Sequence, residues 1–223
     1  MRSYRWDFTF IETYGPLFVR GFIGMAELAA TIAVASLVIG FFIALTRLSK
    51  HRLPRIFGTL YVEFFRNIPS LVHLLWLFYA LPILTQVQVK PFAAAAIGFS
   101  LYTAAYMAEI FRTGISSIEH GQWQAGRALG LTYTQQMRYI VLPQAVQRML
   151  PAFTNQFTDV IKLTAVASLI AYPEIVYYAK QIAETEYRPI EAFTAAAVMF
   201  TIILVPLAYL ALGVEHYFKR FQR

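Results

Sequence analysis

The chain has 223 residues, of which 58% are hydrophobic and only 14% are charged. Because a soluble domain carries roughly 25% charged residues, this composition excludes an ordinary soluble, disordered or collagen-like protein. The absence of cysteine excludes disulfides, thiolate metal sites and a cysteine nucleophile. The net charge of +7 does not indicate nucleic-acid binding, because the basic residues flank long apolar stretches, as they do in membrane proteins.

The first 20 residues do not have the pattern of a secretory signal peptide. Asp7 and Glu12 interrupt their apolar character, and the apolar run that follows is too long for a signal peptide. Their aromatic residues favour the headgroup depth of a membrane. We therefore expect an external amphipathic segment over residues 1–20.

Five later stretches are long and apolar enough to cross a bilayer, which takes roughly 20 residues. The predicted fold class is all-α, a polytopic membrane protein whose transmembrane domain covers 21–217. The fourth span is unusual because Asp159 and Lys162 fall inside it. Pro82 and Pro206 are expected to kink their helices. The predicted spans are 21–46, 68–89, 92–111, 149–171 and 192–214.

Basic residues are unevenly divided between the two sides of these spans. Eleven of the 19 lie between 47 and 55, in the long loop 112–148 and at the C-terminus. Cytoplasmic loops carry the excess of Lys and Arg. The sequence therefore predicts an N-terminus outside and a C-terminus in the cytoplasm.

The chain lacks the common motifs of catalysis and phosphate binding. It has no G-x-x-x-x-G-K-[ST] loop, no H-E-x-x-H pair and no nucleophile elbow, and its four histidines are scattered. We therefore expect neither an enzyme activity nor a metal site in this chain.

The loop 112–148 has the most informative local pattern. Ser116 or Ser117 is predicted to cap a short helix that ends at Leu129, where Gly130 supplies a left-handed stop. Small residues on this helix would let another protein approach its backbone closely, although a plain surface helix explains the spacing equally well. These small residues are Ala125, Gly126 and Ala128.

Residues 124–143 read QAG-x3-G-x9-I-x-LP, which resembles the EAA loop (EAA-x3-G-x9-I-x-LP) of the membrane subunits of ATP-binding-cassette (ABC) importers. Two positions depart from that pattern, since Gln124 replaces the usual Glu and Gly126 the second Ala. The segments YVEFFRNIPSLVHLLWLFYALP, AAYMAEIFRTGISSIEHGQ and LPAFTNQFTDVIKLTAVASLIAYPEI resemble the polar amino-acid (His/Glu/Gln/Arg/opine) permeases. The likeness covers nearly the whole chain from about residue 15.

The resemblance implies a type I ABC importer fold and a permease subunit in a bacterial inner membrane. In this family the EAA loop is a coupling helix that docks on a separate ATPase, whose closure on ATP drives alternating access. The implied cofactors, ATP and Mg²⁺, therefore belong to the partner and not to this chain. The implied partners are an ATPase dimer, a second membrane subunit (a copy or a homologue), an external solute-binding protein and a polar amino acid. The implied coupling residues are Gly121, Gln124, Ala125, Gly126, Gly130, Ile140, Leu142 and Pro143.

Polar residues within the fourth span are candidates for the substrate path. A charge in hydrocarbon is costly, so such residues usually face a cavity or a partner. Asp159 and Lys162 are three apart and can pair, either as a structural pair inside the bundle or along the path. The family typically has Lys-Asp-Thr-Ser where this chain has Lys-Leu-Thr-Ala, which makes the local field more positive and favours glutamate or aspartate. The candidate path residues are Asn155, Asp159, Lys162 and Thr164.

Charged residues at span ends are expected to anchor the helices by pairing or snorkelling, with gating as the alternative. These residues are Glu63, Arg66, Glu109 and Arg112. Two other functions compete with the importer subunit. One is an ATP-independent secondary transporter or channel, for which an internal repeat would be expected and none is found. The other is a membrane scaffold.

Overall fold

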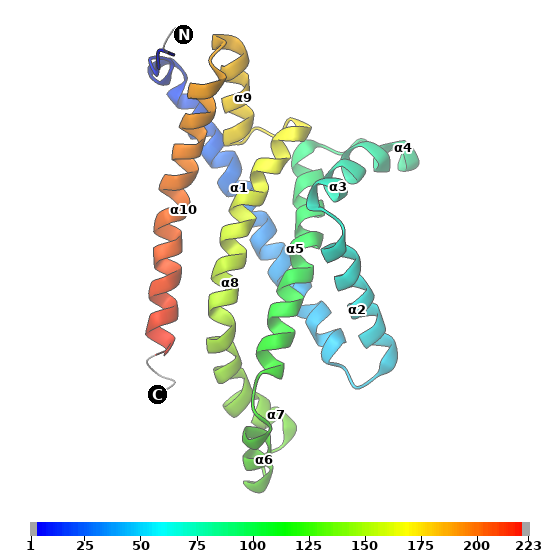
Figure 1. The fold of residues 1–223 in the computed structure, drawn as a ribbon. Coiled ribbons are helices and arrows are strands. Elements are labelled where there is room, and N and C mark those ends of the chain that lie inside the picture. Colours follow the sequence, from blue (N-terminus) through cyan, green and yellow to red (C-terminus); the bar gives the residue numbers. More distant parts are fainter. Residues whose placement is uncertain (1–3, 220–223) are drawn as a thin grey trace. The chain divides into compact units, whose positions relative to one another are not determined.

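The computed structural model describes residues 4–219, with the side chains of 211 and 214–219 left undescribed (Figure 1). Every regular element in this range is helical, which confirms the predicted all-α class. The elements, in chain order, are α1 (Phe10–Leu48), α2 (Arg52–Asn67), α3 (Ser70–Leu75), the π-helix η1 (Trp76–Ala80), α4 (Leu81–Thr85), α5 (Pro91–Ser116), α6 (His120–Ala128), α7 (Tyr133–Gln136), the π-helix η2 (Met137–Val141), α8 (Leu142–Thr164), the 3₁₀-helix η3 (Ala165–Ile170), α9 (Ile175–Glu186) and α10 (Pro189–Lys219).

Within the described residues, three helices are long and apolar enough to cross a membrane by themselves. These are α1, α5 and the part of α10 up to Leu210. Two bent pairs of helical segments also qualify, one formed by α2 with α3–α4 and the other by the run from α7 to η3 with α9. The range therefore holds three to five spans.

The helices extend beyond the apolar stretches from which they were predicted. Residues 10–20 do not form a separate helix but are the first turns of α1, and α5 continues to Ser116. In the stretch 68–89, which was expected as one span, α3, η1 and α4 follow one another without a gap, and the helical run ends at Thr85. Hydropathy marks only the part of a helix that fits hydrocarbon, whereas backbone hydrogen bonding continues into the polar region.

One compact unit contains residues 1–33, 70–100 and 158–207. Its core joins the first half of α1 to α9 and α10 through Phe18, Met25, Ile182 and Ala196, all buried. The contact is close because a Cβ added at Gly21 would lie 2.9 Å from the Cα of Ile175. Small residues at such crossings are typical of membrane helices.

The N-terminal segment is fixed to the start of α10 within the same unit. The hydroxyl of Tyr4 donates to Glu191 Oε2 over 2.5 Å, and the amide of Asp7 donates to Glu191 Oε1 over 3.2 Å. Arg188 forms ion pairs with Glu191 at 3.0 Å and with Asp7 at 3.5 Å. The fully buried Glu191 carboxylate is thus satisfied on both oxygens.

The other unit contains residues 34–69, 101–157 and 208–223. The second half of α1 packs on α5, where Gly40 lies so close that an added Cβ would be 2.5 Å from Met107 Cβ. Gly114 of α5 lies equally tightly against Met149 of α8. Figure 1 shows α6 and α7 beyond the adjoining ends of α5 and α8. Residues 112–148 around them contain the predicted coupling residues and are named the coupling segment after that prediction.

Both π-helices end at a Leu-Pro dipeptide. The amide of Leu81 donates to the carbonyl of Trp76, and that of Leu142 to Met137, each five residues back. Pro82 and Pro143 follow directly. A proline lacks the N–H for the next bond, and its ring pushes away the carbonyl four residues earlier, so the turn before it widens.

Candidate functional site

The start of α6 differs from the sequence prediction. Neither Ser116 nor Ser117 caps this helix; Glu119 occupies the N-cap position, without a side-chain capping bond. The hydroxyl of Ser117 instead donates to the carbonyl of Gly114 over 2.7 Å and so closes the end of α5. The prediction was wrong because α5 runs five residues past its expected end and absorbs Ser116.

The end of α6 confirms the predicted left-handed stop. Gly130 has φ of +72°. Its amide donates to the carbonyl of Arg127 over 2.9 Å, and the amide of Leu131 to that of Gly126 over 3.1 Å. This pair of bonds is a Schellman motif, which uses the last free carbonyls of the helix and requires a residue that tolerates positive φ.

Helix α7 begins with a capping box that the sequence reasoning missed. The amide of Thr132 donates to Gln135 Oε1 over 2.8 Å, and the amide of Gln135 donates to Thr132 Oγ1 over 3.4 Å. Its sequence signal, T-x-x-Q after a helix-stopping glycine, was present. The Schellman motif and the capping box together fix the turn between α6 and α7.

The two sides of α6 have different environments. Gly126 is buried, and a Cβ there would lie 2.8 Å from Gln136 Cγ and 3.0 Å from Ile140 Cδ1. The side-chain amide nitrogen (Nε2) of Gln136 donates to the carbonyl oxygen of Leu131 over 2.7 Å, and this bond holds the Gln136 side chain in place. Most of the remaining surface of α6 is exposed and carries small or neutral side chains, namely Gly121, Gln124, Ala125 and Ala128, together with the basic Arg127 and with His120 at its start.

The structure therefore divides the predicted coupling residues into two groups. Gly126 and Ile140 lie on the inner side, and Gly130, although exposed, serves the fold through its positive φ. Gly121, Gln124 and Ala125 face outward on α6, while Leu142 and Pro143 are exposed at the start of α8. Outside the set, Trp123 stacks on Tyr133 of α7 with ring centroids 5.8 Å apart, which supports α6 from its inner side.

Charged residues at the helix ends of this unit are paired. Glu109 of α5 binds both Arg47 of α1 and Arg112. Glu63 accepts a bond from Asn67 at 2.9 Å, and Arg66 lies 5.2 Å from the ring centre of Tyr106. Glu109 thus ties the ends of two helices together, which agrees with the expected anchoring role.

The polar stretch of α8 is the second candidate site. Lys162 Nζ and Asp159 Oδ1 form the predicted pair at 3.1 Å, with both side chains more than half exposed. Asn155, on the same helix, is exposed. Thr164 is fully buried, and its hydroxyl donates to the carbonyl of Ile161 over 2.7 Å. The pair is therefore open on the surface of the chain, while Thr164 is part of the packing.

Sequence comparison decides the family. Residues 36–223 match the family of binding-protein-dependent transport system inner membrane components. The chain belongs to this family. The permease is 39% identical over 206 residues to a probable amino-acid ABC transporter permease of Bacillus subtilis, and the alignment covers 90% of each chain. It is also 32% identical over 197 residues to a probable glutamine ABC transporter permease of the same organism, covering 88% of this chain and 89% of the relative.

A solved structure agrees with the sequence relatives. The crystal structure of an amino acid ABC transporter with histidines superimposes on the permease with a TM-score of 0.91 and 29% identity, covering 96% of this chain and 100% of that one. The permease has the type I ABC importer fold and is a membrane-spanning subunit of an importer of polar amino acids. It is a multi-pass protein of the inner membrane. Its family and relatives, which are permease subunits of ABC importers, separate it from an ATP-independent secondary transporter, a channel or a scaffold.

Proposed function

We propose that the outward side of α6 docks on a separate ATPase subunit and passes its movement to the membrane helices. The observation that carries this proposal is the division of α6 into an inner side that packs on α7 and η2 and an outer side that is exposed. The inner contacts of Gly126 with Gln136 and Ile140 make α6, α7 and η2 move as one piece. The outer side exposes Ala125 and Ala128, so a partner's cleft reaches close to the helix backbone.

Gln124 sets the character of this docking. It is exposed on the outer side and keeps the hydrogen-bonding capacity of the family's glutamate without its charge. A neutral amide forms no ion pair with the ATPase. Position 124 is therefore expected to add no salt dependence to docking, because screening acts on charges, which leaves the exposed Arg127 as the charged side chain within α6.

The proposed assembly follows from this docking. ATP and Mg²⁺ bind the partner ATPase dimer, and this chain performs no hydrolysis. A second membrane subunit completes the path, and an external binding protein delivers the substrate. The coupling segment then faces the cytoplasm, with the N-terminus outside, in keeping with the Lys and Arg excess of that segment. Part of that charge pattern, at residues 1–3 and 220–223, lies outside the described residues.

The transported amino acid is proposed to be acidic, glutamate or aspartate. Asn155, Asp159 and Lys162 are exposed on α8, and Leu163 stands where the family typically has a second acid. The local balance is therefore one base to one acid rather than one to two. Such a field repels an anionic substrate less. When Asp159 is displaced, Lys162 is free to pair with the carboxylate of the substrate.

Purification of the complete importer tests the docking proposal. Ala125→Arg places a long cation on the outer side of α6 and is expected to abolish both recovery of the ATPase and transport. The thermal unfolding midpoint of the permease should stay unchanged, because Ala125 is exposed. Gln181→Arg, which adds the same charge to an exposed position of α9, is the matched control. Full recovery of the ATPase with Ala125→Arg contradicts the proposal.

Competition for uptake tests the substrate proposal. Unlabelled glutamate or aspartate should compete with labelled glutamate, and Lys162→Gln should raise the KM about fivefold through loss of roughly 1 kcal/mol of attraction. Lys180→Gln is the matched control, since Lys180 is also exposed in an ion pair, with Glu184 at 3.9 Å. If arginine outcompetes glutamate, the acidic-substrate proposal is rejected while ATPase docking is unaffected.

A further inference from the structure

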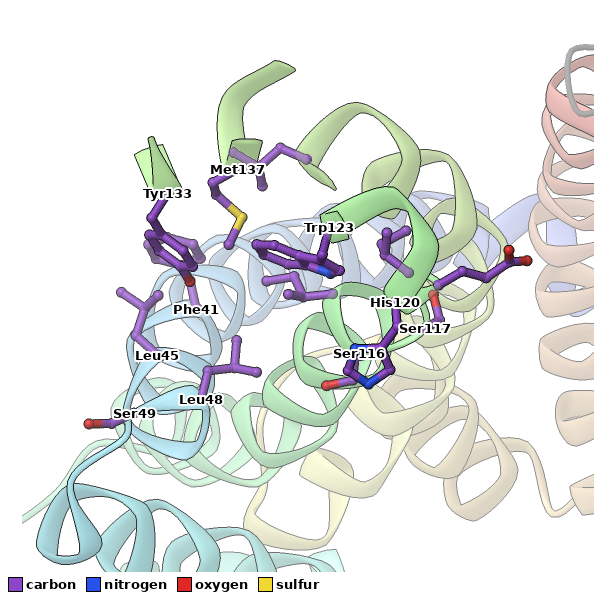
Figure 2. A pocket seen from close by; sticks show the side chains of 14 residues that line it. Phe41, Leu45, Leu48, Ser49, Ser116, Ser117, His120, Trp123, Tyr133 and Met137 are labelled. Atoms are coloured by element: carbon purple, nitrogen blue, oxygen red, sulfur yellow. The ribbon is translucent and has the colours of Figure 1, made fainter. Parts of the chain in front are cut away.

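A groove runs between the end of α1 and the coupling segment, with all its lining residues in one compact unit. Its volume is about 890 Å³, within the usual size range of ligand sites, roughly 300–1,000 Å³. Figure 2 shows Phe41, Leu45 and Leu48 of α1 facing Trp123 and Tyr133 across it. Nothing in the coupling mechanism above uses this space.

The lining of the groove changes from apolar to polar along its length. On α1 the sequence is Phe41, Leu45, Leu48 and then Ser49, where the helix has ended. The spacings of four and three residues place the three apolar side chains on one helix face. On the opposite wall, Ile115 of α5 is followed by Ser116 and Ser117 and, after the apolar Ile118, by Glu119 and His120. An occupant must therefore be apolar at one end and polar at the other.

The apolar end of the groove continues into the membrane-facing side of α1. Phe41 and Leu45 are 41% and 46% exposed, and they extend a row of exposed apolar residues that begins at Val34 and includes Val38. In a multi-pass membrane protein, such an apolar row is expected to face lipid tails. Arg47 in the last turn of α1, with Lys50 just after it, is expected to hold the end of this helix at the depth of the headgroups. The molecules that meet the groove at this depth are phospholipids.

The charges beside the polar end favour an anion. Arg148 donates from its exposed guanidinium to the carbonyl of Ser117, a lining residue. Lys50 and Arg52 directly follow Ser49 and are exposed. Glu119 is the acidic side chain among the lining residues, and no lysine or arginine is among them. The three basic residues are each bonded to a lining residue or within three positions of one, so they outnumber this acid at the margin of the groove. His120 adds a polar ring to the lining.

We propose that this groove binds an anionic glycerophospholipid of the cytoplasmic leaflet. One acyl chain lies along Phe41, Leu45 and Leu48, with the headgroup phosphate at Ser49, Ser116 and His120. The lipid would contact both α1 and α6, so it fills the space between a membrane span and the coupling helix. The binding site goes beyond ATPase docking and does not depend on it. Its assignment to the cytoplasmic leaflet uses the proposed orientation.

Lipid retention by the complete importer tests the proposal. The importer is reconstituted in nanodiscs of equal parts phosphatidylglycerol and phosphatidylcholine, re-extracted, and analysed by native mass spectrometry. We expect phosphatidylglycerol to be retained in preference to phosphatidylcholine. Leu45→Trp fills the apolar end and should reduce retention about tenfold, as expected from displacing a few methylene groups. Leu37→Trp, the same change on an exposed leucine of α1 outside the groove, should retain the lipid.

A second pair of variants tests the headgroup end. Ser49→Asp adds a negative charge and should remove the preference for phosphatidylglycerol, whereas Ser49→Asn should keep it. Equal retention of both lipids by the unaltered importer overturns the anionic headgroup. Unchanged retention in Leu45→Trp overturns the groove as the site, and so does cross-linking of position 45 to another protein chain. Loss of the ATPase in any variant reports separately on docking.

Discussion

The coupling segment and the polar stretch of α8 are both candidate sites, but they are built in different ways. In the coupling segment, Gly126, Gln136 and Ile140 contact one another within 15 residues of chain. In α8, the Asp159–Lys162 pair is exposed, and Thr164, two residues on, is buried and bonded to its own helix. The inner side of the first site is packed by residues of this chain alone. The second site is open, which agrees with the proposal that a second membrane subunit completes the path.

The difference explains why the two sites respond to different kinds of change. A site closed by its own packing is sensitive to the volume of its inner residues. An open charged pair is sensitive to what the partner or substrate places beside it. Substitutions on the inner side of α6, at its end and on the open pair should therefore give effects of decreasing size on the stability of this chain.

The largest effect is expected from Gly126→Leu. The side chain has no room beside Gln136 and Ile140, and overpacking of this kind costs about 1–3 kcal/mol, which exceeds the roughly 1 kcal/mol gained by removing a helical glycine. Hydrogen exchange of the purified importer should show α6 and α7 opening first. Gly121→Leu, with open space around it, is the matched control and should leave exchange unchanged or slower. Equal protection in both variants would show that the inner side of α6 is not a packed contact.

A smaller effect is expected from Gly130→Ala. At φ of +72° an alanine costs roughly 1 kcal/mol, because its Cβ crowds the following carbonyl. Gly130→Asn should cost less, since asparagine tolerates this conformation better. Thermal unfolding and ATPase recovery should both fall in the order glycine, asparagine, alanine. An alanine variant as stable as the natural chain would contradict the Schellman motif.

The smallest effect on stability is expected from Asp159→Asn. An exposed pair contributes less than about 0.5 kcal/mol, whereas breaking a buried pair costs about 3–5 kcal/mol. The unfolding midpoint of the assembled importer should therefore change little, while the KM for glutamate changes. A large loss of stability in the assembly would show that the second membrane subunit buries the pair, and would remove it from the substrate path.

The parts of this structure that the sequence predicted correctly are those governed by nearest neighbours in the chain. The left-handed turn at Gly130 and the Asp159–Lys162 pair depend on residues fewer than six positions apart, so spacing was sufficient. The capping box formed by Thr132 and Gln135 depends on equally local residues and was predictable from its T-x-x-Q pattern. The Leu-Pro pairs at Leu81 and Leu142 also held a local signal, because proline shapes the turn before it.

Other features depend on contacts that spacing does not contain. Gly126 is buried against Ile140 because the chain returns through η2. Spacing along α6 does not contain this contact, and Gly126 was therefore predicted to face outward with Ala125 and Ala128. The extension of α5 through Ser116 depends on packing of Gly114 against Met149 of α8. The sharp bend between α2 and the helical run that starts at Ser70 was hidden because hydropathy averages over a window and does not report the direction of the chain.

The widened turn η2 holds one residue more than an α-helical turn, because its hydrogen bond reaches five residues back instead of four. An α-helix turns about 100° per residue, so a deletion within the regular part of α8 would rotate every residue between it and the next loop. Loss of one residue from η2 instead closes the wide turn to an α-helical one and leaves Val141 and Ala145 facing the core. The importer should therefore accept deletion of the exposed Tyr139 more readily than deletion of a residue within α8.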